Sequence, residues 1–249
     1  MKFLIAYLVY AIGMAVAMAR RGFRSPPPAP QAAASGQQIK RILVIGPTGG
    51  TGRELIAQAL EQGYEVTALA RDPAKLQGTH PNLKVLRGDV LDPSSVDAAV
   101  QGQDAVVSAL GHRRLFVPSR VQSEGTRNVI RAMERHGVRR FICETGIGLG
   151  NSAGKLGLFA TLFFFPVVLP IYFWDKARQE KVVAESSLDW VLVRPGVLTN
   201  GARRGVYRHG VDVGSYVLTG TIGRADVAEF MLKQLKSDHY LRRAPAILW

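Results

Sequence analysis

Residues 42–53 read ILVIGPTGGTGR, four apolar residues followed by a run of glycine, proline and threonine and then an arginine. A short apolar run of this kind is typical of a buried strand. Glycine has no Cβ, so its backbone can turn tightly and approach another group closely. The helical pattern over 52–62 would direct its free N–H groups and positive dipole end at the same turn. This stretch therefore predicts a site for a dinucleotide pyrophosphate, formed by Gly46, Thr48, Gly49, Thr51 and Gly52.

The same alternation of strand and helix continues along the chain. Apolar runs lie at 42–46, 65–70, 83–89, 104–111, 140–145 and 190–196. Helical patterns lie at 52–62, 93–101, 121–136, 175–187 and 224–236. Apolar strands that alternate with amphipathic helices indicate a parallel sheet covered on both faces. We therefore expect a single Rossmann-like, doubly wound α/β domain over residues 40–249, with its ligand at the carboxyl ends of the strands.

The end of the second strand predicts which dinucleotide binds. NAD sites usually place an acidic residue there to hold the ribose 2′-hydroxyl. This chain has Arg71 at that position and Lys75 one helical turn later. Two cations suit a 2′-phosphate, so we expect NADP, with NADPH preferred over NADH. Asp72 leaves NAD open as the alternative.

The next two strands add four candidate contacts. Asp89 and Val90 end the third strand, where this fold places the adenine and a carboxylate can accept a hydrogen bond from its amino group. A helix cap is the alternative role for Asp89. Leu110 and Gly111 end the fourth strand and would lie along the ribose and phosphates.

Residues 1–24 contain an apolar stretch without charge, Phe3–Ala19, between basic residues. As a helix it would be about 25 Å long, which is short for a bilayer core of ~30 Å. Arginines on its C-terminal side favour a membrane anchor that leaves the following domain in the cytoplasm. A cleaved signal with export is the alternative, as is a transit segment or a misassigned start codon. Residues 25–39, rich in proline and alanine, are expected to be a linker.

Charge and composition limit the partners. The net charge is +13, which suits anionic ligands such as cofactor phosphates, or an anionic membrane surface. No nucleic-acid-binding motif accompanies this charge, so we expect no nucleic acid partner. Cys143 is the single cysteine, so no internal disulfide can form. His80, His136, His209 and His239 lack metal-ligand spacing with each other or with Cys143, so no metal site is predicted.

Residues 156–174 carry no charge over 19 positions. The strands before and after this segment belong to one sheet, and Pro166 and Pro170 interrupt a helix, which argues against a single membrane crossing. Two interpretations stay open, a lid or dimer face over the site and a membrane-contact segment. Both predict an apolar or aromatic small-molecule substrate. The sequence makes no prediction of oligomeric state.

Four stretches of the chain resemble a known family. They are GPTGGTGRELIAQALEQGYEVTALARDPAKL, GDVLDPSSVDAAVQGQDAVVSALG, SEGTRNVIRAMERHGV and FMLKQLKSDHY. They are similar to the atypical short-chain dehydrogenases of the NmrA-like NAD(P)H-binding family, nearest to the flavin reductase and biliverdin-IXβ reductase group. The resemblance runs from about 41 to 240. It implies an NADPH-dependent reductase that passes hydride to a planar ring, with Gly50 as a further cofactor contact and with Pro195 and Val197 near the nicotinamide.

The catalytic positions depart from that group. Thr145 stands where the reductase has a serine, and Lys176 and Glu180 stand where it has histidines. Tyr172 and Lys176 have the spacing of the dehydrogenase tyrosine–lysine pair, in which the lysine lowers the tyrosine pKa and favours proton donation. The alternative is that Tyr172 only packs and that Lys176 is solvated.

The sequence as a whole predicts an NADPH-dependent oxidoreductase whose acceptor is apolar or aromatic, such as a flavin or quinone. A non-enzymatic NADP(H)-binding regulator or assembly factor of NmrA-like type is the alternative, and the same catalytic departures support it. An isomerase or dehydratase that depends on Tyr172 is a third class.

Overall fold

The computed structural model describes residues 2–21, 38–76, 78–111, 119–155, 157, 170–218 and 220–249. Their main feature is a mostly parallel sheet with the strand order β3-β2-β1-β4-β5-β6-β10-β8, in which β8 alone is antiparallel to its neighbour. A small parallel pair, β7 with β9, lies beside it. The strands are β1 (Arg41–Ile45), β2 (Glu65–Ala70), β3 (Leu83–Arg87), β4 (Ala105–Ser108), β5 (Arg140–Glu144), β6 (Asp189–Pro195), β7 (Val197–Thr199), β8 (Arg208–Gly210), β9 (Thr221–Gly223) and β10 (Ala246–Leu248).

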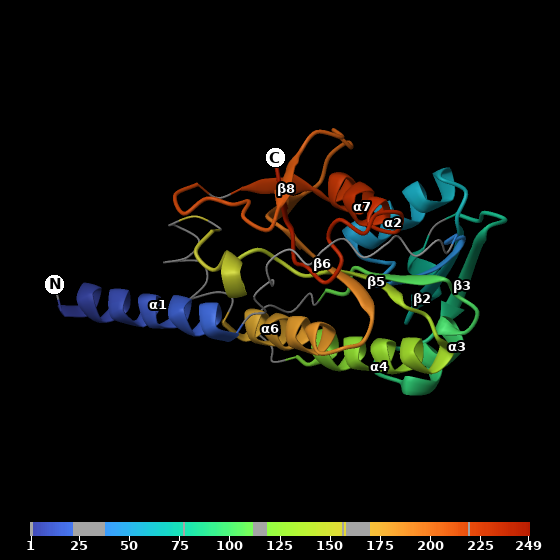
Figure 1. The fold of residues 1–249 in the computed structure, drawn as a ribbon, viewed down its shortest axis with the longest axis horizontal. Coiled ribbons are helices and arrows are strands. Elements are labelled where there is room, and N and C mark those ends of the chain that lie inside the picture. Colours follow the sequence, from blue (N-terminus) through green and yellow to red (C-terminus); the bar gives the residue numbers. More distant parts are fainter. Residues whose placement is uncertain are drawn as a thin grey trace.

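Helices cover both faces of the sheet, with α2 and α7 on one face and α3, α4 and α6 on the other (Figure 1). Successive side chains of β1 alternate between these two cores. Ile42 and Val44 pack with α2 and α7, whereas Leu43 and Ile45 pack on the opposite face. The helical elements are α1 (Lys2–Arg21), α2 (Gly50–Glu61), α3 (Pro93–Val100), α4 (Val121–His136), α6 (Pro170–Ala184), α7 (Arg224–Lys233) and the short 3-10 turns η1 (Pro73–Lys75) and η2 (Gly150–Ser152).

This architecture confirms the expected Rossmann-like domain and locates its ligand crevice. The chain runs from β1 outward to β3 and then crosses back to β4 on the other side of β1. The strand order reverses between β1 and β4, and doubly wound sheets bind ligands at the carboxyl ends of the strands at such a point.

Two details of the fold differ from the sequence prediction. Helix α6 begins at Pro170 rather than at residue 175, because proline is tolerated in the first turn of a helix, where its missing N–H needs no partner. Strands β7, β8, β9 and β10 were not predicted, since three residues are too few to show a period.

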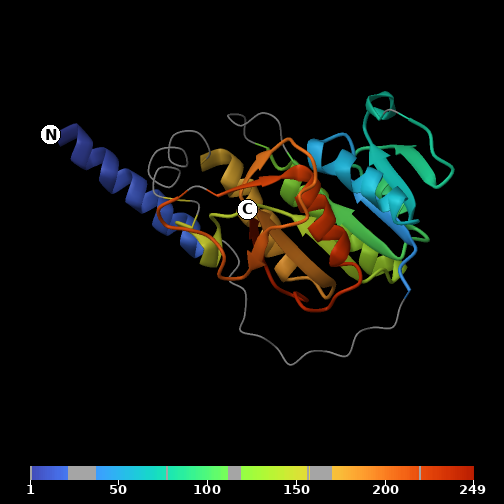
Figure 2. The ribbon, with the colours of Figure 1, turned by 90° about the horizontal axis from the view of Figure 1, so that it is seen from above.

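Helix α1 lies at the edge of the domain, with its C-terminal part beside α6 and η2 (Figures 1 and 2). Ala11 is fully buried, and Met14 packs against a cluster that includes Leu149 and Phe173. In the described part of the chain, no helix combines the length and the apolar character that a membrane span requires. The prediction of a membrane-anchored protein with a cytoplasmic domain is therefore wrong.

Two other predicted segments fall largely outside the described residues. The linker 25–39 is described only from residue 38 onward. Of the apolar segment 156–174, the structure describes residue 157 and the beginning of α6 at 170–174. Whether this segment forms a lid, a dimer face or a membrane contact stays a prediction.

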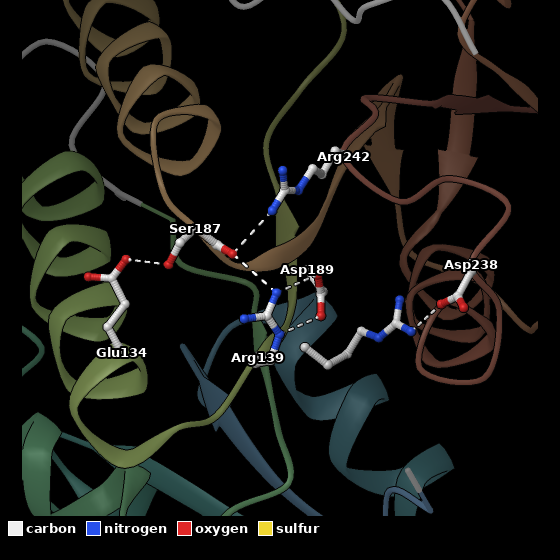
Figure 3. A network of polar contacts seen from close by, with 7 residues as sticks. Glu134, Arg139, Ser187, Asp189, Asp238 and Arg242 are labelled. Atoms are coloured by element: carbon white, nitrogen blue, oxygen red, sulfur yellow. Dashed lines mark hydrogen bonds and ion pairs between the residues drawn. The ribbon is translucent and has the colours of Figure 1, made fainter. Parts of the chain in front are cut away.

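The amino-terminal ends of β5 and β6, at the sheet edge opposite the ligand crevice, are joined by a polar network (Figure 3). Arg139 donates two hydrogen bonds to Asp189, at 3.0 and 3.2 Å. Arg139 and Arg242 both donate to the carbonyl oxygen of Ser187, whose hydroxyl donates to Glu134. These groups are largely exposed, so each contact contributes little to stability, and the network mainly links α4 with the loop before β6 and with β6 itself.

Candidate dinucleotide site

The turn between β1 and α2 has a shape that requires glycine at two positions. Gly46 has a φ of +77°, and a Cβ there would lie 2.6 Å from the carbonyl oxygen of Ala109. A Cβ on Gly52 would lie 2.1 Å from the carbonyl oxygen of Gly46. The N–H of Gly49 donates to that same oxygen at 3.1 Å and closes the turn. The chain therefore passes over itself with no room for side chains at these points.

The turn leaves the N-terminal end of α2 available to a ligand. Gly49 holds the N-cap position, so no side chain caps this helix end. Thr48 is half-buried in the turn, and Thr51 is buried in the first turn of the helix. The first N–H groups of a helix and its dipole attract anions, and a Rossmann-like fold binds its pyrophosphate here.

Three cations gather after β2. Arg71 is exposed directly beyond the strand end, and Lys75 lies in η1, 3.0 Å from Asp72. Arg53 of α2 donates a hydrogen bond to the carbonyl oxygen of Lys75 at 3.2 Å. Lys75 also holds the pKa of the Asp72 carboxyl below its ordinary value, so this carboxylate is engaged by a lysine. Sequence reasoning found Arg71 and Lys75 but missed Arg53, which stands in a different element.

The predicted adenine and ribose contacts lie in the segments that follow β3 and β4. Val90 and Leu110 are buried and converge on Gly125 of α4, where a Cβ would lie 2.8 Å from Val90 and 3.2 Å from Leu110. Asp89 accepts from the N–H of Leu91 at 3.0 Å, which is a local turn contact. The cap of α3 is Asp92 rather than Asp89. Gly111 is exposed at the end of the strand.

Thr145 takes part in a buried ionic network. Its hydroxyl donates to Oε1 of Glu180 at 2.9 Å. The Glu180 carboxylate also accepts two hydrogen bonds from Arg194, at 2.8 and 2.7 Å, and Arg194 donates to Asn151 at 2.7 Å. Glu180 and Arg194 are fully buried. The Thr145 hydroxyl is therefore committed to the interior of the protein in this conformation.

The predicted pair on α6 is described only in part. Lys176 is 5% exposed, and its Nζ donates to the carbonyl oxygen of Thr145 at 2.9 Å. The alternative of a solvated Lys176 is therefore wrong. Tyr172 lies one helical turn earlier in α6, and its side chain is outside the described residues. Its role as a proton donor stays a prediction.

The residues expected near the nicotinamide follow β6. Pro195 is buried, and its carbonyl oxygen accepts from the N–H of Ile147 at 3.1 Å, which ties the ends of β5 and β6 together. Val197 begins β7 and is 42% exposed. Both therefore lie at the carboxyl edge of the sheet, as the glycine turn does.

Sequence reasoning missed a carboxyl group at the centre of this edge. Glu144 ends β5 with 7% of its surface exposed, and its Oε1 accepts from the hydroxyl of Thr51 at 3.2 Å. Burial raises the pKa of this carboxyl, while Lys176, the Thr51 hydroxyl and Arg224 act in the opposite direction. The sequence signal for Glu144 is the stretch CETG at the end of the predicted fifth strand, where the prediction concerned only Thr145.

Arg224 is a second missed residue. It begins α7, yet its side chain lies over Gly50, where a Cβ would be 2.4 Å from the Arg224 Cδ. Its guanidinium donates to Oδ1 of Asn200 at 2.7 Å. The glycine turn thus has a cation beside it that comes from the far end of the chain.

Within the residues that the structure describes, no group of three acidic, histidine or cysteine side chains could hold a metal ion.

Comparison with known proteins defines the class of this site. The profile of the NAD(P)H-binding family matches residues 46–238, and the chain belongs to this family. It is 31% identical over 215 residues to an uncharacterised chloroplastic protein of Arabidopsis thaliana, covering 81% of this chain and 74% of that one. The chain spans half or less of the length of the other curated relatives it matches.

Two solved structures are similar to the chain. ChuY, an anaerobillin reductase from Escherichia coli O157:H7, superposes with a TM-score of 0.69 at 25% identity, over 84% of this chain and 97% of that one. A short-chain dehydrogenase/reductase from Veillonella parvula in complex with NADP superposes with a TM-score of 0.73 at 18% identity, over 85% and 95%. The second likeness shows the fold alone. The resemblance to the atypical short-chain dehydrogenases is confirmed, and the chain has the fold and family of an NAD(P)H-binding oxidoreductase.

Proposed function

We propose that this protein binds NADPH in preference to NADH and transfers its hydride to an apolar or aromatic acceptor such as a flavin or quinone. The observation that carries the cofactor preference is the group of three cations after β2. Arg71 follows β2 directly, Lys75 lies in η1, and Arg53 donates a hydrogen bond to the carbonyl oxygen of Lys75. This supports a cationic site for a 2′-phosphate at the end of the second strand. The one carboxylate there, Asp72, is paired with Lys75.

The residues around the expected nicotinamide support a reaction that needs little acid catalysis. Hydride transfer to a flavin or quinone depends mainly on holding the two rings together in an apolar site. When bound, the dinucleotide supplies the hydride. The chain orients it through the glycine turn and through buried residues such as Val90 and Leu110. The Thr145 hydroxyl is bound to Glu180, which agrees with a site that does not rely on it as an acid.

Titrations of NADPH and NADH, followed by fluorescence, test the cofactor. We expect NADPH to bind at least about tenfold more tightly, a difference of ~1.4 kcal/mol. Arg71→Ala should reduce this preference more than a substitution of the exposed Lys84 on β3, which serves as the control. Equal affinities for the two cofactors would contradict the preference.

Oxidation of NADPH in the presence of FMN or a short-chain quinone tests the reaction. Turnover that depends on the acceptor is the expected result. Tight NADPH binding without turnover across such acceptors would favour a non-enzymatic NADP(H)-binding regulator or assembly factor instead. An isomerase- or dehydratase-type enzyme would cause no net oxidation of NADPH and would depend on Tyr172. Tyr172→Phe should therefore abolish the activity of such an enzyme, whereas it should barely affect hydride transfer to a flavin.

A further inference from the structure

The carboxyl group of Glu144 lies beside the N-terminal end of α2, where a bound anionic cofactor would repel a negatively charged side chain. It accepts a hydrogen bond from Thr51, the second residue of α2, at 3.2 Å. The N-terminal end of α2 is also the part of the fold that holds a dinucleotide pyrophosphate. A carboxylate and a diphosphate would therefore compete for the same positive end of one helix.

We propose that Glu144 is a further cofactor-binding residue that carries a proton in the complex and donates a hydrogen bond from its carboxylic acid to a diphosphate oxygen. This inference rests on the proposed function, because it requires that the chain binds a pyridine dinucleotide. Two anions within a few ångströms repel each other strongly where water is excluded. A carboxylic acid removes that repulsion, and it can donate where a carboxylate can only accept.

The groups around Glu144 come from three helices. Thr51 of α2 donates to it, Lys176 of α6 lies close enough to attract it, and Arg224 of α7 does the same from across the glycine turn. Lys176 is also bound to the Thr145 carbonyl oxygen, and Arg224 is also bound to Asn200. Both cations have other partners, so neither is held by Glu144 alone.

The protonation of Glu144 gives binding a defined pH dependence. Burial already raises the pKa of Glu144 in the free protein, in spite of the two cations. A bound diphosphate would raise this pKa further, because it adds negative charge nearby. The complex would then hold more protons than the free protein over the interval between the two pKa values. Cofactor affinity should therefore fall as the pH rises through that interval.

Calorimetric titration with NADP⁺ from about pH 5.5 to about pH 9 tests this inference on the wild type and on Glu144→Gln. The glutamine amide is neutral and can donate, so it imitates the protonated acid at every pH. We expect the two proteins to bind alike at the acidic end. At the alkaline end the variant should bind about tenfold or more tightly, because one coupled proton changes affinity up to ~10-fold per pH unit.

The titration of the ligand's own 2′-phosphate affects the affinity of both proteins equally, since both bind the same molecule at each pH. Glu61→Gln is the matched control, because it makes the same charge change at the other end of α2, about 16 Å along the helix. This variant should follow the wild type throughout. If Glu144→Gln and Glu61→Gln shift affinity equally, the effect is one of net charge and the inference is overturned.

A second measurement needs no variant. At about pH 7.5 the 2′-phosphate is largely dianionic, so it exchanges few protons on binding. The heat of NADP⁺ binding in two buffers of different ionisation enthalpy then reports proton uptake by the protein. A net uptake supports the inference, and no uptake overturns it. Folded protein that binds NADP⁺ at no pH would remove the proposed function itself, a different outcome from binding without proton uptake.

Discussion

At the scale of single residues, the glycine turn is determined by close contacts rather than by flexibility. Gly52→Ala would place a methyl group 2.1 Å from the Gly46 carbonyl oxygen, so the backbone of the turn would have to move. We expect this variant to lose at least about tenfold in dinucleotide affinity, because a small displacement misplaces the N–H groups that bind phosphate. Gly201→Ala, where the added Cβ meets nothing within 4 Å, is the control and should bind normally. Unchanged binding by Gly52→Ala would show that the ligand does not use this turn.

Substitutions at Thr145 distinguish a structural role of its hydroxyl from a catalytic role. Thr145→Val removes the donor to Glu180 and leaves a buried carboxylate with one hydrogen bond fewer. The expected result is a loss of about 1–3 kcal/mol in the free energy of unfolding, measured by urea denaturation. Thr145→Ser, which keeps the hydroxyl, should recover most of it. If Thr145→Val instead lowered kcat while leaving stability unchanged, the hydroxyl would act on the substrate, as its alignment with the reductase serine implies.

At the scale of elements, α6 organises one side of the site through a contact with the start of α4. The carboxylate of Asp175 accepts from the N–H groups of Gln122 and Ser123, at 2.9 and 3.3 Å, and from the Ser123 hydroxyl. A side chain of one helix thus caps another. Asp175→Ala should cost about 1–3 kcal/mol, since it leaves buried N–H groups without an acceptor. Asp212→Ala, at a side chain that is 92% exposed, should change the unfolding free energy by less than about 0.5 kcal/mol.

The elements were predicted well where their patterns are long and local. Each of the six predicted strands and five predicted helices is present, and α4 has the predicted bounds 121–136. The glycine turn was predicted because the small residues that it requires stand close together in the sequence. Arg224 and Glu144 were not found, because they reach that turn from α7 and β5. Contacts between elements far apart in sequence leave no periodic signal in one chain.

At the scale of the whole molecule, the error about the N-terminus has a physical explanation. An apolar stretch between basic residues predicts a membrane anchor when hydropathy alone is considered. In the structure α1 packs part of its length on α6 and η2, with Ala11 buried against the domain. Ala11 and Met14 are therefore used for packing on the domain, whereas the large apolar side chains of α1 given next stay exposed: Phe3, Ile5, Val9, Tyr10, Ile12 and Val16. Hydropathy alone does not distinguish these two sets of positions.

The single cysteine offers a measurement of global stability. Cys143 lies in β5 with its side chain fully buried, and burial raises the pKa of its thiol to about 12. Because the thiolate is the reactive form, a thiol reagent at about pH 8 should modify the native protein only through opening of the sheet. The modification rate then follows the population of the open state. The denatured protein, as the control, should react at once and with one equivalent.

The same cysteine links stability to cofactor binding. A ligand that binds only the folded state lowers the open population by the factor 1 + [L]/Kd, so NADP⁺ at 100 times its Kd should slow the modification of Cys143 about 100-fold. The sensitivity of this rate to NADP⁺ therefore gives an affinity that is independent of any enzymatic turnover. Rapid modification that NADP⁺ does not slow would mean that β5 opens locally, without disrupting the glycine turn against which Glu144 is bound. Slowing by NADP⁺ would instead show that the site and the centre of the sheet unfold as one unit.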